Sequence, residues 1–285
     1  MGAEGLVTVP ELQAKKARGE RITMLTAYDY PVARIVDAAQ IDVMLVGDSL
    51  GMVGLGYSST VPVTMEEMIH HAKAVRRGVR RALLVGDMPF MSFQVSWEAA
   101  VVNAGRFLKE AGCVAVKLEG GLESLGAAKA IVEIGIPVMG HVGLTPQTAG
   151  RFGGFKVQGR DPASAEALLR AAEALQAVGC FAVVLECVPD ALGRRITQRL
   201  KIPTIGIGSG PWCDGQVLVT HDLLGLYDQV QPKFVKRYAE LGRVAQAAVQ
   251  QFRREVESGQ FPTAAHSYRV EVKARRARGP SPRMG

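Results

Sequence analysis

The chain has 285 residues, of which 48% are apolar and 21% are charged, and its formal net charge is +7. This balance is ordinary for a globular protein that buries a full core, and no apolar run reaches the ~18 residues of a membrane-spanning helix. The four cysteines form no C-x-x-C pair, and the N-terminus shows no signal-peptide pattern. We therefore expect one reduced, cytoplasmic domain with no membrane attachment.

Most of the positive charge lies at the C-terminal end of the sequence. Residues 269–285 contain six basic residues and one acidic residue, so this segment supplies +5 of the +7. We expect one domain over residues 1–268 and a disordered basic tail over residues 269–285. A basic tail is also found in proteins that bind nucleic acid or anionic lipid. The remaining +2 argues against nucleic-acid binding by the domain itself.

Short apolar runs recur along the chain, each followed by a polar or glycine-rich break and then by a helical pattern. Such near-continuous runs are typical of parallel strands that are buried on both faces. The predicted strands are Ile22–Thr26, Val43–Val46, Leu83–Val85, Val114–Leu118, Val138–Gly140, Ala182–Leu185, Thr204–Ile207 and Val217–Val219. These α/β units favour a (β/α)8 TIM barrel, and a doubly wound sheet is the alternative.

Several helices have recognisable ends. Thr64 and Glu67 form the pattern of a capping box, and Asp161 followed by Pro162 is typical of a helix N-terminus. Apolar residues recur at helical spacing from Phe234 to Val256 and predict a long amphipathic helix. This helix packs either on its own barrel or on a neighbouring subunit.

Charged residues stand where the predicted strands end. Leu45-Val46-Gly47-Asp48 recurs letter for letter as Leu84-Val85-Gly86-Asp87, so each Asp ends a strand at the same point of a strand–helix unit. Lys117 and Glu119 are two residues apart in a strand and therefore point to the same face. The carboxyl ends of barrel strands form the active-site mouth. The residues predicted to converge there are Asp48, Asp87, Lys117, Glu119, His141 and Glu186.

Four carboxylates at one mouth need a compensating ion, because unpaired buried charge is costly. A site rich in oxygen ligands, without clustered Cys or His, favours Mg²⁺ over zinc. The structural alternative is that each Asp only caps a helix or a turn. The segment Gly206–Gly210 superficially resembles a dinucleotide-binding turn, but no apolar helix start follows it.

Short segments containing these residues form an ordered series along the chain. They are Met24–Asp29, Gly47–Gly51, Gly86–Phe90, Val116–Gly120, Gly140–Gln147, Lys156–Arg160, Leu185–Pro189, Gly206–Gly208, Cys213–Gln216 and Phe234–Tyr238. In this order they resemble the ketopantoate hydroxymethyltransferase family, over about residues 6–268. The resemblance implies a (β/α)8 barrel of the phosphoenolpyruvate/pyruvate class and a homodecamer built as a pentamer of dimers.

The resemblance also implies an enzyme of pantothenate and coenzyme A biosynthesis. Such an enzyme transfers a hydroxymethyl group from 5,10-methylenetetrahydrofolate to 3-methyl-2-oxobutanoate through a Mg²⁺-stabilised enolate, giving 2-dehydropantoate. The residues that the family pattern assigns to Mg²⁺ are Asp48, Asp87 and Glu119, the last directly or through water. The residues it assigns to the oxo acid are Asp48, Ser49, Asp87 and Lys117. The place of His141 at a strand end makes it a further candidate for substrate binding, independently of the resemblance. Glu186 takes the position of the proton acceptor.

Three positions depart from the family pattern, namely Ser58, Ser209 and Ala265. None belongs to the predicted metal site. The alternative enzyme is a lyase of the same barrel class that acts on another 2-oxo acid, and the alternative from another class is a nucleic-acid-binding protein that uses its basic tail. The sequence does not identify the folate-binding residues, any feedback regulation or the role of the tail.

Overall fold

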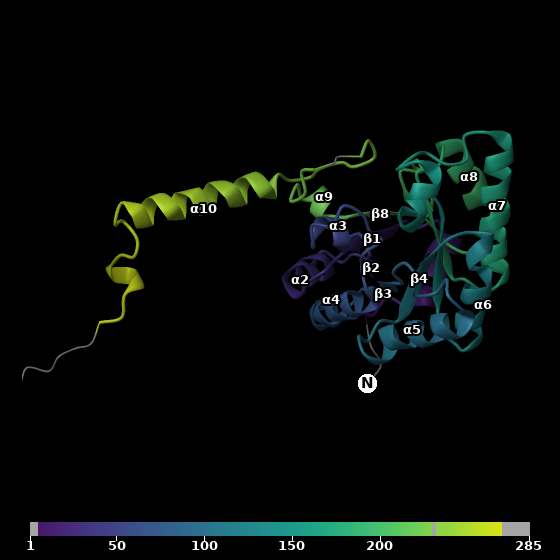
Figure 1. Ribbon diagram of the computed structural model, residues 1–285, viewed down its shortest axis with the longest axis horizontal. Helices are drawn as coiled ribbons and strands as arrows, with labels where there is room; N and C mark the ends of the chain where they lie inside the picture. Colours follow the sequence, from purple (N-terminus) through teal and green to yellow (C-terminus); the bar gives the residue numbers. More distant parts are fainter. Residues whose placement is uncertain (1–4, 230–231, 270–285) are drawn as a thin grey trace, which may run out of the picture. The chain divides into compact units, whose positions relative to one another are not determined.

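Parallel strands close into an eight-stranded barrel in the computed structural model of the chain (Figure 1), which describes residues 5–229 and 232–269. The strands pair in sequence order, and β1 also pairs with β8. Their bounds are β1 Ile22–Thr26, β2 Val43–Val46, β3 Leu83–Asp87, β4 Ala115–Glu119, β5 Val138–Gly143, β6 Ala182–Glu186, β7 Thr204–Ile207 and β8 Gly215–Leu218. The predicted barrel is confirmed, because a doubly wound sheet would leave β1 and β8 unpaired with each other.

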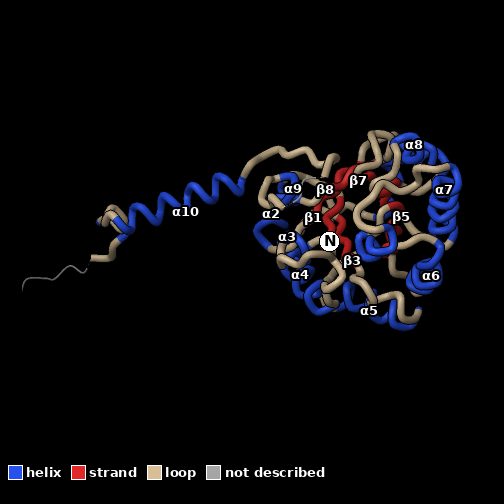
Figure 2. Tube along the Cα trace, turned by 45° about the horizontal axis from the view of Figure 1, so that its top comes forward, coloured by secondary structure: helices blue, strands red, loops and turns tan. Residues whose placement is uncertain are grey.

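Helices alternate with the strands, and α2, α4, α5, α6, α7 and α8 surround the barrel (Figure 2). The helix bounds are α1 Val9–Arg18, α2 Tyr30–Ala38, α3 Leu50–Val53, α4 Met65–Gly78, α5 Trp97–Lys109, α6 Leu125–Glu133, α7 Pro162–Ala177, α8 Asp190–Arg199, α9 Thr220–Leu223 and α10 Leu241–Glu257. Short 3₁₀ helices are η1 Leu122–Ser124, η2 Pro146–Phe152 and η3 Ala264–His266. None of the helices in the described ranges has the length and apolar composition of a transmembrane span.

Both predicted helix starts are confirmed. The side chain of Thr64 accepts from the Glu67 N–H, and the Glu67 carboxylate accepts from the Thr64 N–H at 2.8 Å, which completes the capping box of α4. Asp161 accepts from the Ser164 N–H at 3.0 Å and caps α7, whose first residue is Pro162. Side chains thus satisfy backbone donors that an isolated helix end would leave unpaired.

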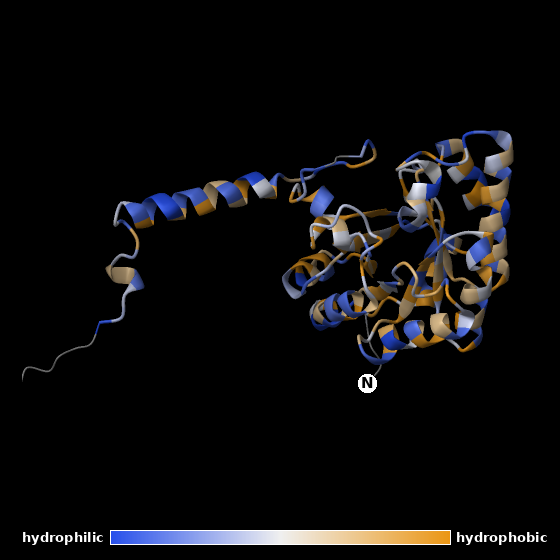
Figure 3. Ribbon diagram, in the orientation of Figure 1, coloured by the Kyte–Doolittle hydropathy of each residue, from blue (hydrophilic) through white to orange (hydrophobic). Residues whose placement is uncertain are grey.

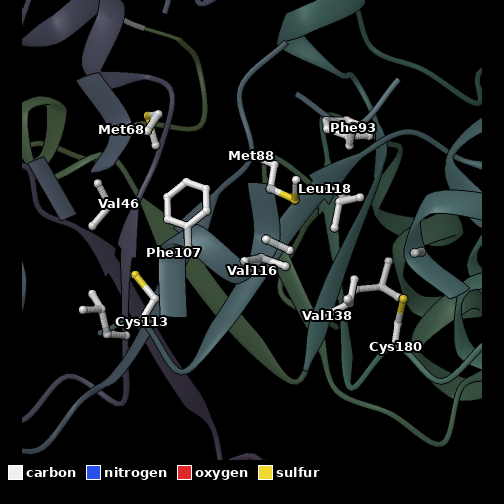
Figure 4. Close-up of a cluster of buried hydrophobic side chains, with 14 of the residues drawn as sticks. Val46, Met68, Met88, Phe93, Phe107, Cys113, Val116, Leu118, Val138 and Cys180 are labelled. Carbon is white, nitrogen blue, oxygen red and sulfur yellow. The ribbon is translucent and has the colours of Figure 1, made fainter. Parts of the chain in front are cut away.

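The barrel has two apolar layers because successive side chains of a strand point to opposite faces. Val43 and Leu45 of β2 belong to the layer that fills the barrel interior. Met44 and Val46 belong to the layer between the sheet and the helices, where Figure 4 shows Val46 near Phe107 of α5. Because the strands are buried on both faces, their sequences are nearly continuous apolar runs.

The glycines of the repeated Leu-Val-Gly-Asp segments lie in close contact with neighbouring side chains, most tightly at Gly86. The Phe107 ring is fully buried against β3, and a Cβ at Gly86 would lie 2.3 Å from it. A Cβ at Gly47 would lie 2.9 Å from the Ser49 hydroxyl oxygen. The repeat therefore combines a tightly packed strand end with the acidic residue that follows it.

The last predicted helix begins later than expected. The prediction placed its start at Phe234, which is wrong, because α10 begins at Leu241. The Phe234 ring packs against Gly208, where an added Cβ would lie 2.8 Å from the ring. The Tyr238 N–H donates a hydrogen bond to the Leu223 carbonyl at 2.8 Å. These contacts hold the segment in a non-helical conformation, which helical periodicity alone cannot reveal.

The chain divides into two compact units, Met1–Ala239, which contains the barrel, and Glu240–Gly285, which contains α10. No residue of α10 is buried, and Val244, Val249 and Phe252 are 64%, 68% and 56% exposed. Figure 3 shows hydrophobic and hydrophilic residues side by side along α10. The single domain predicted over residues 1–268 stays a prediction, and the predicted basic tail lies, from residue 270 on, outside the described residues.

The apolar stripe of α10 leads to a prediction about assembly. An exposed stripe of this kind needs a covering surface, and we expect a neighbouring subunit to supply it. Leu241→Asp combined with Phe252→Asp should lower the mass of the assembly in light scattering, whereas Gln246→Asp combined with Gln250→Asp, on the opposite face, should not. An unchanged, well-folded assembly in the first variant would contradict an interface role.

Asp42 connects β1, β2 and α1 at the N-terminal end of the barrel. It is buried, its carboxylate accepts from the Thr23 N–H at 3.0 Å, and it forms ion pairs with Lys15 at 2.8 Å and Arg81 at 3.2 Å. Burial by itself raises the pKa of such a group. Here the hydrogen bonds from Lys15 and Thr23 outweigh burial, so the pKa of Asp42 lies below its usual value.

Asp42→Asn should therefore lower the free energy of unfolding by about 1–3 kcal/mol near neutral pH. Because the folded-state pKa is depressed, this stabilisation is present above the unfolded pKa of about 3.9 and is lost as the pH falls through the folded value. Urea unfolding of the parent and the variant should show a difference that shrinks towards acid. The exposed Asp228→Asn serves as control, and a difference that does not depend on pH would contradict this account.

Candidate active site

The carboxyl ends of β3, β4, β5 and β6 carry charged residues on the inward face of the barrel. Each lies two or four residues after a side chain of the interior apolar layer, such as Val85 before Asp87, and side chains two apart share a face. The residues placed in this way are Asp87, Lys117, Glu119, His141 and Glu186. The register sets Asp87 opposite Lys117 and Glu119 opposite His141. The predicted convergence at the barrel mouth is thus present in the structure.

A buried ion pair between Asp87 and Lys117 lies at the centre of this group. The Lys117 ammonium donates to both Asp87 carboxylate oxygens, at 2.7 and 2.8 Å, and lies 3.7 Å from a Glu119 oxygen. Burial favours neutral lysine, but the charges of Asp87 and Glu119 outweigh it and raise the pKa of Lys117 above its usual value. Lys117 is therefore a fixed ammonium group.

Asp48 and Ser49 follow β2 and join the group from the neighbouring strand end. The Asp48 N–H donates to an Asp87 carboxylate oxygen at 3.2 Å, and the Ser49 hydroxyl is 2.8 Å from the Tyr28 hydroxyl. Burial, together with the negative charges of Asp87 and Glu119, raises the pKa of Asp48 well above its usual value. The protein alone thus compensates the Asp48 carboxylate poorly.

Burial likewise raises the pKa of Asp87, although Lys117 acts in the opposite direction. The carboxylates of Asp48, Asp87 and Glu119, set against one ammonium group, leave a net charge of −2 when all are ionised. A hard divalent cation fits this charge and these oxygen donors. No group of three His, Cys, Asp or Glu side chains within residues 5–229 and 232–269 is arranged to hold a metal by itself. Substrate or water oxygens would therefore have to complete the coordination of a bound cation.

His141 lies between two carboxylates. Its Nδ1 is 3.5 Å from a Glu119 oxygen, and its Nε2 is 3.3 Å from a Glu186 oxygen. Neither contact has the geometry of an aligned hydrogen bond, so both are charge contacts. Burial and Lys117 lower the pKa of His141, but the two carboxylates outweigh them and raise it to about 9. His141 is therefore an imidazolium near neutral pH, and it links Glu186 to the rest of the site.

Glu186 is the most accessible of these acidic side chains, with 15% of its side-chain surface exposed, compared with 3% for Glu119. The backbone beside Glu186 depends on a glycine in β5. Gly143 has a φ of 103°, and a Cβ there would lie 2.2 Å from the Glu186 carbonyl oxygen. The glycine thus allows the ends of β5 and β6 to approach closely.

Gln147 contacts two carboxylates of the site and has no place among the predicted residues. Its side-chain amide donates to Asp48 at 2.9 Å, and its backbone N–H donates to Glu119 at 3.0 Å. Tyr28 was also missed, and it contacts Ser49. Neither residue is charged, and both lie beyond the strands, Tyr28 in a loop and Gln147 in η2. The only available signal was their position in the segments Met24–Asp29 and Gly140–Gln147.

The departures from the family pattern lie outside this group of contacts. Ser209 is buried, and its hydroxyl donates to the Leu185 carbonyl at 2.5 Å, on the strand that carries Glu186. Ser58 takes no part in the hydrogen bonds and ion pairs described for the mouth, and Ala265 belongs to the other compact unit, Glu240–Gly285. The segment Gly206–Gly210 begins within β7 and continues beyond it, and its Gly208 packs against Phe234.

A closed (β/α)8 barrel with charged residues at the carboxyl ends of its strands has the architecture in which barrel enzymes place their active sites. Solved structures with this fold include a phosphonopyruvate hydrolase, with a TM-score of 0.59 at 13% identity, which covers 90% of this chain and 92% of that one. They also include a 2,3-dimethylmalate lyase, a PEP mutase/isocitrate lyase superfamily member, with a TM-score of 0.57, 13% identity and the same coverage.

The chain belongs to the ketopantoate hydroxymethyltransferase family, whose model matches residues 6–264. A relative from Moorella thermoacetica is 60% identical over 269 residues, which cover 94% of this chain and 100% of the relative. A relative from Heliobacterium modesticaldum is 56% identical over 265 residues, which cover 93% of this chain and 96% of the relative. Both are named 3-methyl-2-oxobutanoate hydroxymethyltransferase, and the predicted family and the prediction of a transferase are confirmed.

Proposed function

We propose that the chain transfers a hydroxymethyl group from 5,10-methylenetetrahydrofolate to 3-methyl-2-oxobutanoate and so forms 2-dehydropantoate for pantothenate and coenzyme A synthesis. The name of its relatives supports this reaction. The observation that carries the mechanism is the net charge of −2 left by buried carboxylates around Lys117. Such a group of residues suits a divalent cation and an acidic substrate that chelates it.

We assign Mg²⁺ to Asp48 and Asp87, with Glu119 acting directly or through water. Mg²⁺ usually keeps several waters and uses one or two protein carboxylates, which agrees with a site where only part of the coordination comes from side chains. The phosphonopyruvate hydrolase that shares this fold is described in complex with oxalate and Mg²⁺. Oxalate presents two adjacent oxygens to a cation, as a 2-oxo acid does. When bound, Mg²⁺ would polarise the ketone and acidify the neighbouring C–H.

The oxo acid would be held by Asp48, Ser49, Asp87 and Lys117. The Lys117 ammonium offsets the negative charge that develops on the enolate oxygen, and its position is fixed by two hydrogen bonds to Asp87. The Ser49 hydroxyl, held by Tyr28, is available to a carboxylate oxygen. His141 remains a candidate for substrate contact through the charge it carries between Glu119 and Glu186.

Glu186 is the proposed general base. It is the most exposed acid of the group, and its carboxylate lies 3.3 Å from Nε2 of His141. It takes the proton from the carbon beside the ketone. The resulting enolate carbon forms a bond to the methylene carbon as the bond of that carbon to one folate nitrogen breaks. Water then forms the C–O bond of the hydroxymethyl group as the bond to the second folate nitrogen breaks. The two nitrogens take up the proton held by Glu186 and one proton from the water, which gives tetrahydrofolate.

A homodecamer, built as a pentamer of dimers, is the proposed assembly. Two apolar surfaces of the chain support self-association with further copies of it. One is the exposed stripe of α10, and the other is a groove of about 970 Å³ beside β1 and β8, lined in part by Met24, Val217 and Phe234. The four cysteines are all free, which suits the proposed cytoplasmic location.

The prediction that tests this function concerns Glu186. In deuterated water, the enzyme with Mg²⁺ and 3-methyl-2-oxobutanoate should exchange the hydrogen beside the ketone without any folate, as NMR can follow. Glu186→Gln removes the base at nearly constant size and should slow this exchange by about 10²–10⁴-fold while the oxo acid still binds. Glu123→Gln, an exposed acid near the mouth, should exchange like the parent.

Exchange in Glu186→Gln at the rate of the parent would show that another group is the base. A product assay separates the rival lyase, since 2-dehydropantoate should form only when 5,10-methylenetetrahydrofolate and Mg²⁺ are both supplied. Binding of RNA or DNA that falls with salt and is lost when the chain is cut after Tyr268 would instead support the nucleic-acid alternative.

A further inference from the structure

Gln147 connects three neighbouring strand ends of the site. It lies at the start of η2, directly after β5, and is only 3% exposed. Its side-chain nitrogen Nε2 donates to Asp48 Oδ2 and to the Met88 carbonyl, each at 2.9 Å. Its backbone N–H donates to Glu119 Oε2 at 3.0 Å. One neutral residue therefore contacts the segments that follow β2 and β3 and the end of β4.

The orientation of the Gln147 amide is determined by its partners. The Met88 carbonyl and an ionised Asp48 only accept hydrogen bonds, so the NH₂ group must face both of them. The amide oxygen accepts from Gln94 Nε2 at 3.3 Å. Both N–H groups are thus in use, and the amide cannot rotate without leaving a buried donor unpaired.

The turn that carries Gln147 is itself held in place. The Thr145 and Thr148 hydroxyls are 2.6 Å apart, and the Thr148 N–H donates to the Thr145 carbonyl at 2.9 Å. Pro146 occupies the first position of η2 and restricts its backbone. Gln147 is therefore a rigid donor and not a mobile loop residue.

A neutral donor at this position has a specific consequence for the charge of the site. It fixes Asp48 and Glu119 without cancelling the charge of either, whereas a lysine here would reduce the net charge from −2 to −1. It also engages Asp48 Oδ2, while no described residue hydrogen-bonds to Oδ1. The two carboxylates are thus oriented and keep their charge for a cation.

We propose that Gln147 is a positioning residue that holds Asp48 and Glu119 in the arrangement that binds the divalent cation, and through it the oxo acid. This inference rests on the proposed function, because it assumes that these carboxylates serve a cation. Groups that orient metal ligands in this way typically contribute about 10–100-fold to metal affinity.

The test measures cation binding in the full-length protein without substrate. Mn²⁺ serves as the probe for the Mg²⁺ site, with free Mn²⁺ measured by electron paramagnetic resonance and Mg²⁺ added as a competitor. Gln147→Met keeps the length of the side chain and removes both N–H donors. Gln147→Glu keeps its shape and replaces the donors by an acceptor, which provides a second variant should the first fold poorly. Gln158→Met, on the same segment and away from these carboxylates, is the matched control.

We expect Gln147→Met to weaken Mn²⁺ binding about 10–100-fold, while Gln158→Met binds like the parent. The Mg²⁺ concentration that half-saturates turnover should rise by the same factor. Gln147→Glu should also bind Mn²⁺ more weakly, despite its additional carboxylate, because Asp48 loses its donor. Circular dichroism and thermal melting check that each variant is folded.

A merely structural role would lower the melting temperature and leave the Mn²⁺ affinity of the folded protein unchanged, and that result would overturn the inference. If the parent binds Mn²⁺ and both Gln147 variants bind it equally well, the inference fails and the proposed function stands. If the parent protein binds neither Mn²⁺ nor Mg²⁺, even in the presence of the oxo acid, both the proposed function and the inference about Gln147 fail.

Discussion

The ion pair between Asp87 and Lys117 is the interaction around which the site is arranged. It joins residues opposite each other on neighbouring strands, so its geometry follows from the barrel register and not from any loop. Asp48 and Glu119 are buried carboxylates beside it. Burial and the neighbouring acids raise the pKa of Asp48, whereas Lys117 and His141 outweigh burial and lower the pKa of Glu119. A buried ion pair contributes little net stability because desolvation offsets its Coulomb energy. A role in binding therefore accounts better for this pair than a role in stabilising the fold.

The remaining contacts divide the charged residues into two groups. Around Lys117, the acids exceed the bases and favour a cation. The second group is centred on His141, whose ring lies between the carboxylates of Glu119 and Glu186. Glu119 belongs to both groups, because its carboxylate contacts both Lys117 and His141. A change of charge in one group therefore alters the electrostatic environment of the other. In the proposed mechanism, this arrangement separates the residues that hold the oxo acid from Glu186, which removes its proton.

The barrel and most of the charged residues at its mouth could be predicted from the sequence, because the regular geometry of the barrel brings the ends of its strands together. The repeated Leu-Val-Gly-Asp segments and the spacing of Lys117 and Glu119 place side chains on one face through the period of a strand. Tertiary contacts without a local signal could not be predicted. Phe234 fits a helical period but packs against Gly208, and Gln147 is a neutral amide whose role depends on carboxylates far away in the sequence.

The central claim is that the excess of buried negative charge around Lys117 serves a divalent cation shared with the 2-oxo acid. The most direct measurement is a calorimetric titration of 3-methyl-2-oxobutanoate into the folded protein, with and without Mg²⁺, for the parent and for Asp87→Asn. The account predicts that the parent binds the oxo acid only with Mg²⁺ and that Asp87→Asn loses this Mg²⁺-dependent binding. Equal affinity of the parent with and without Mg²⁺, or unchanged Mg²⁺-dependent binding in Asp87→Asn, would contradict it.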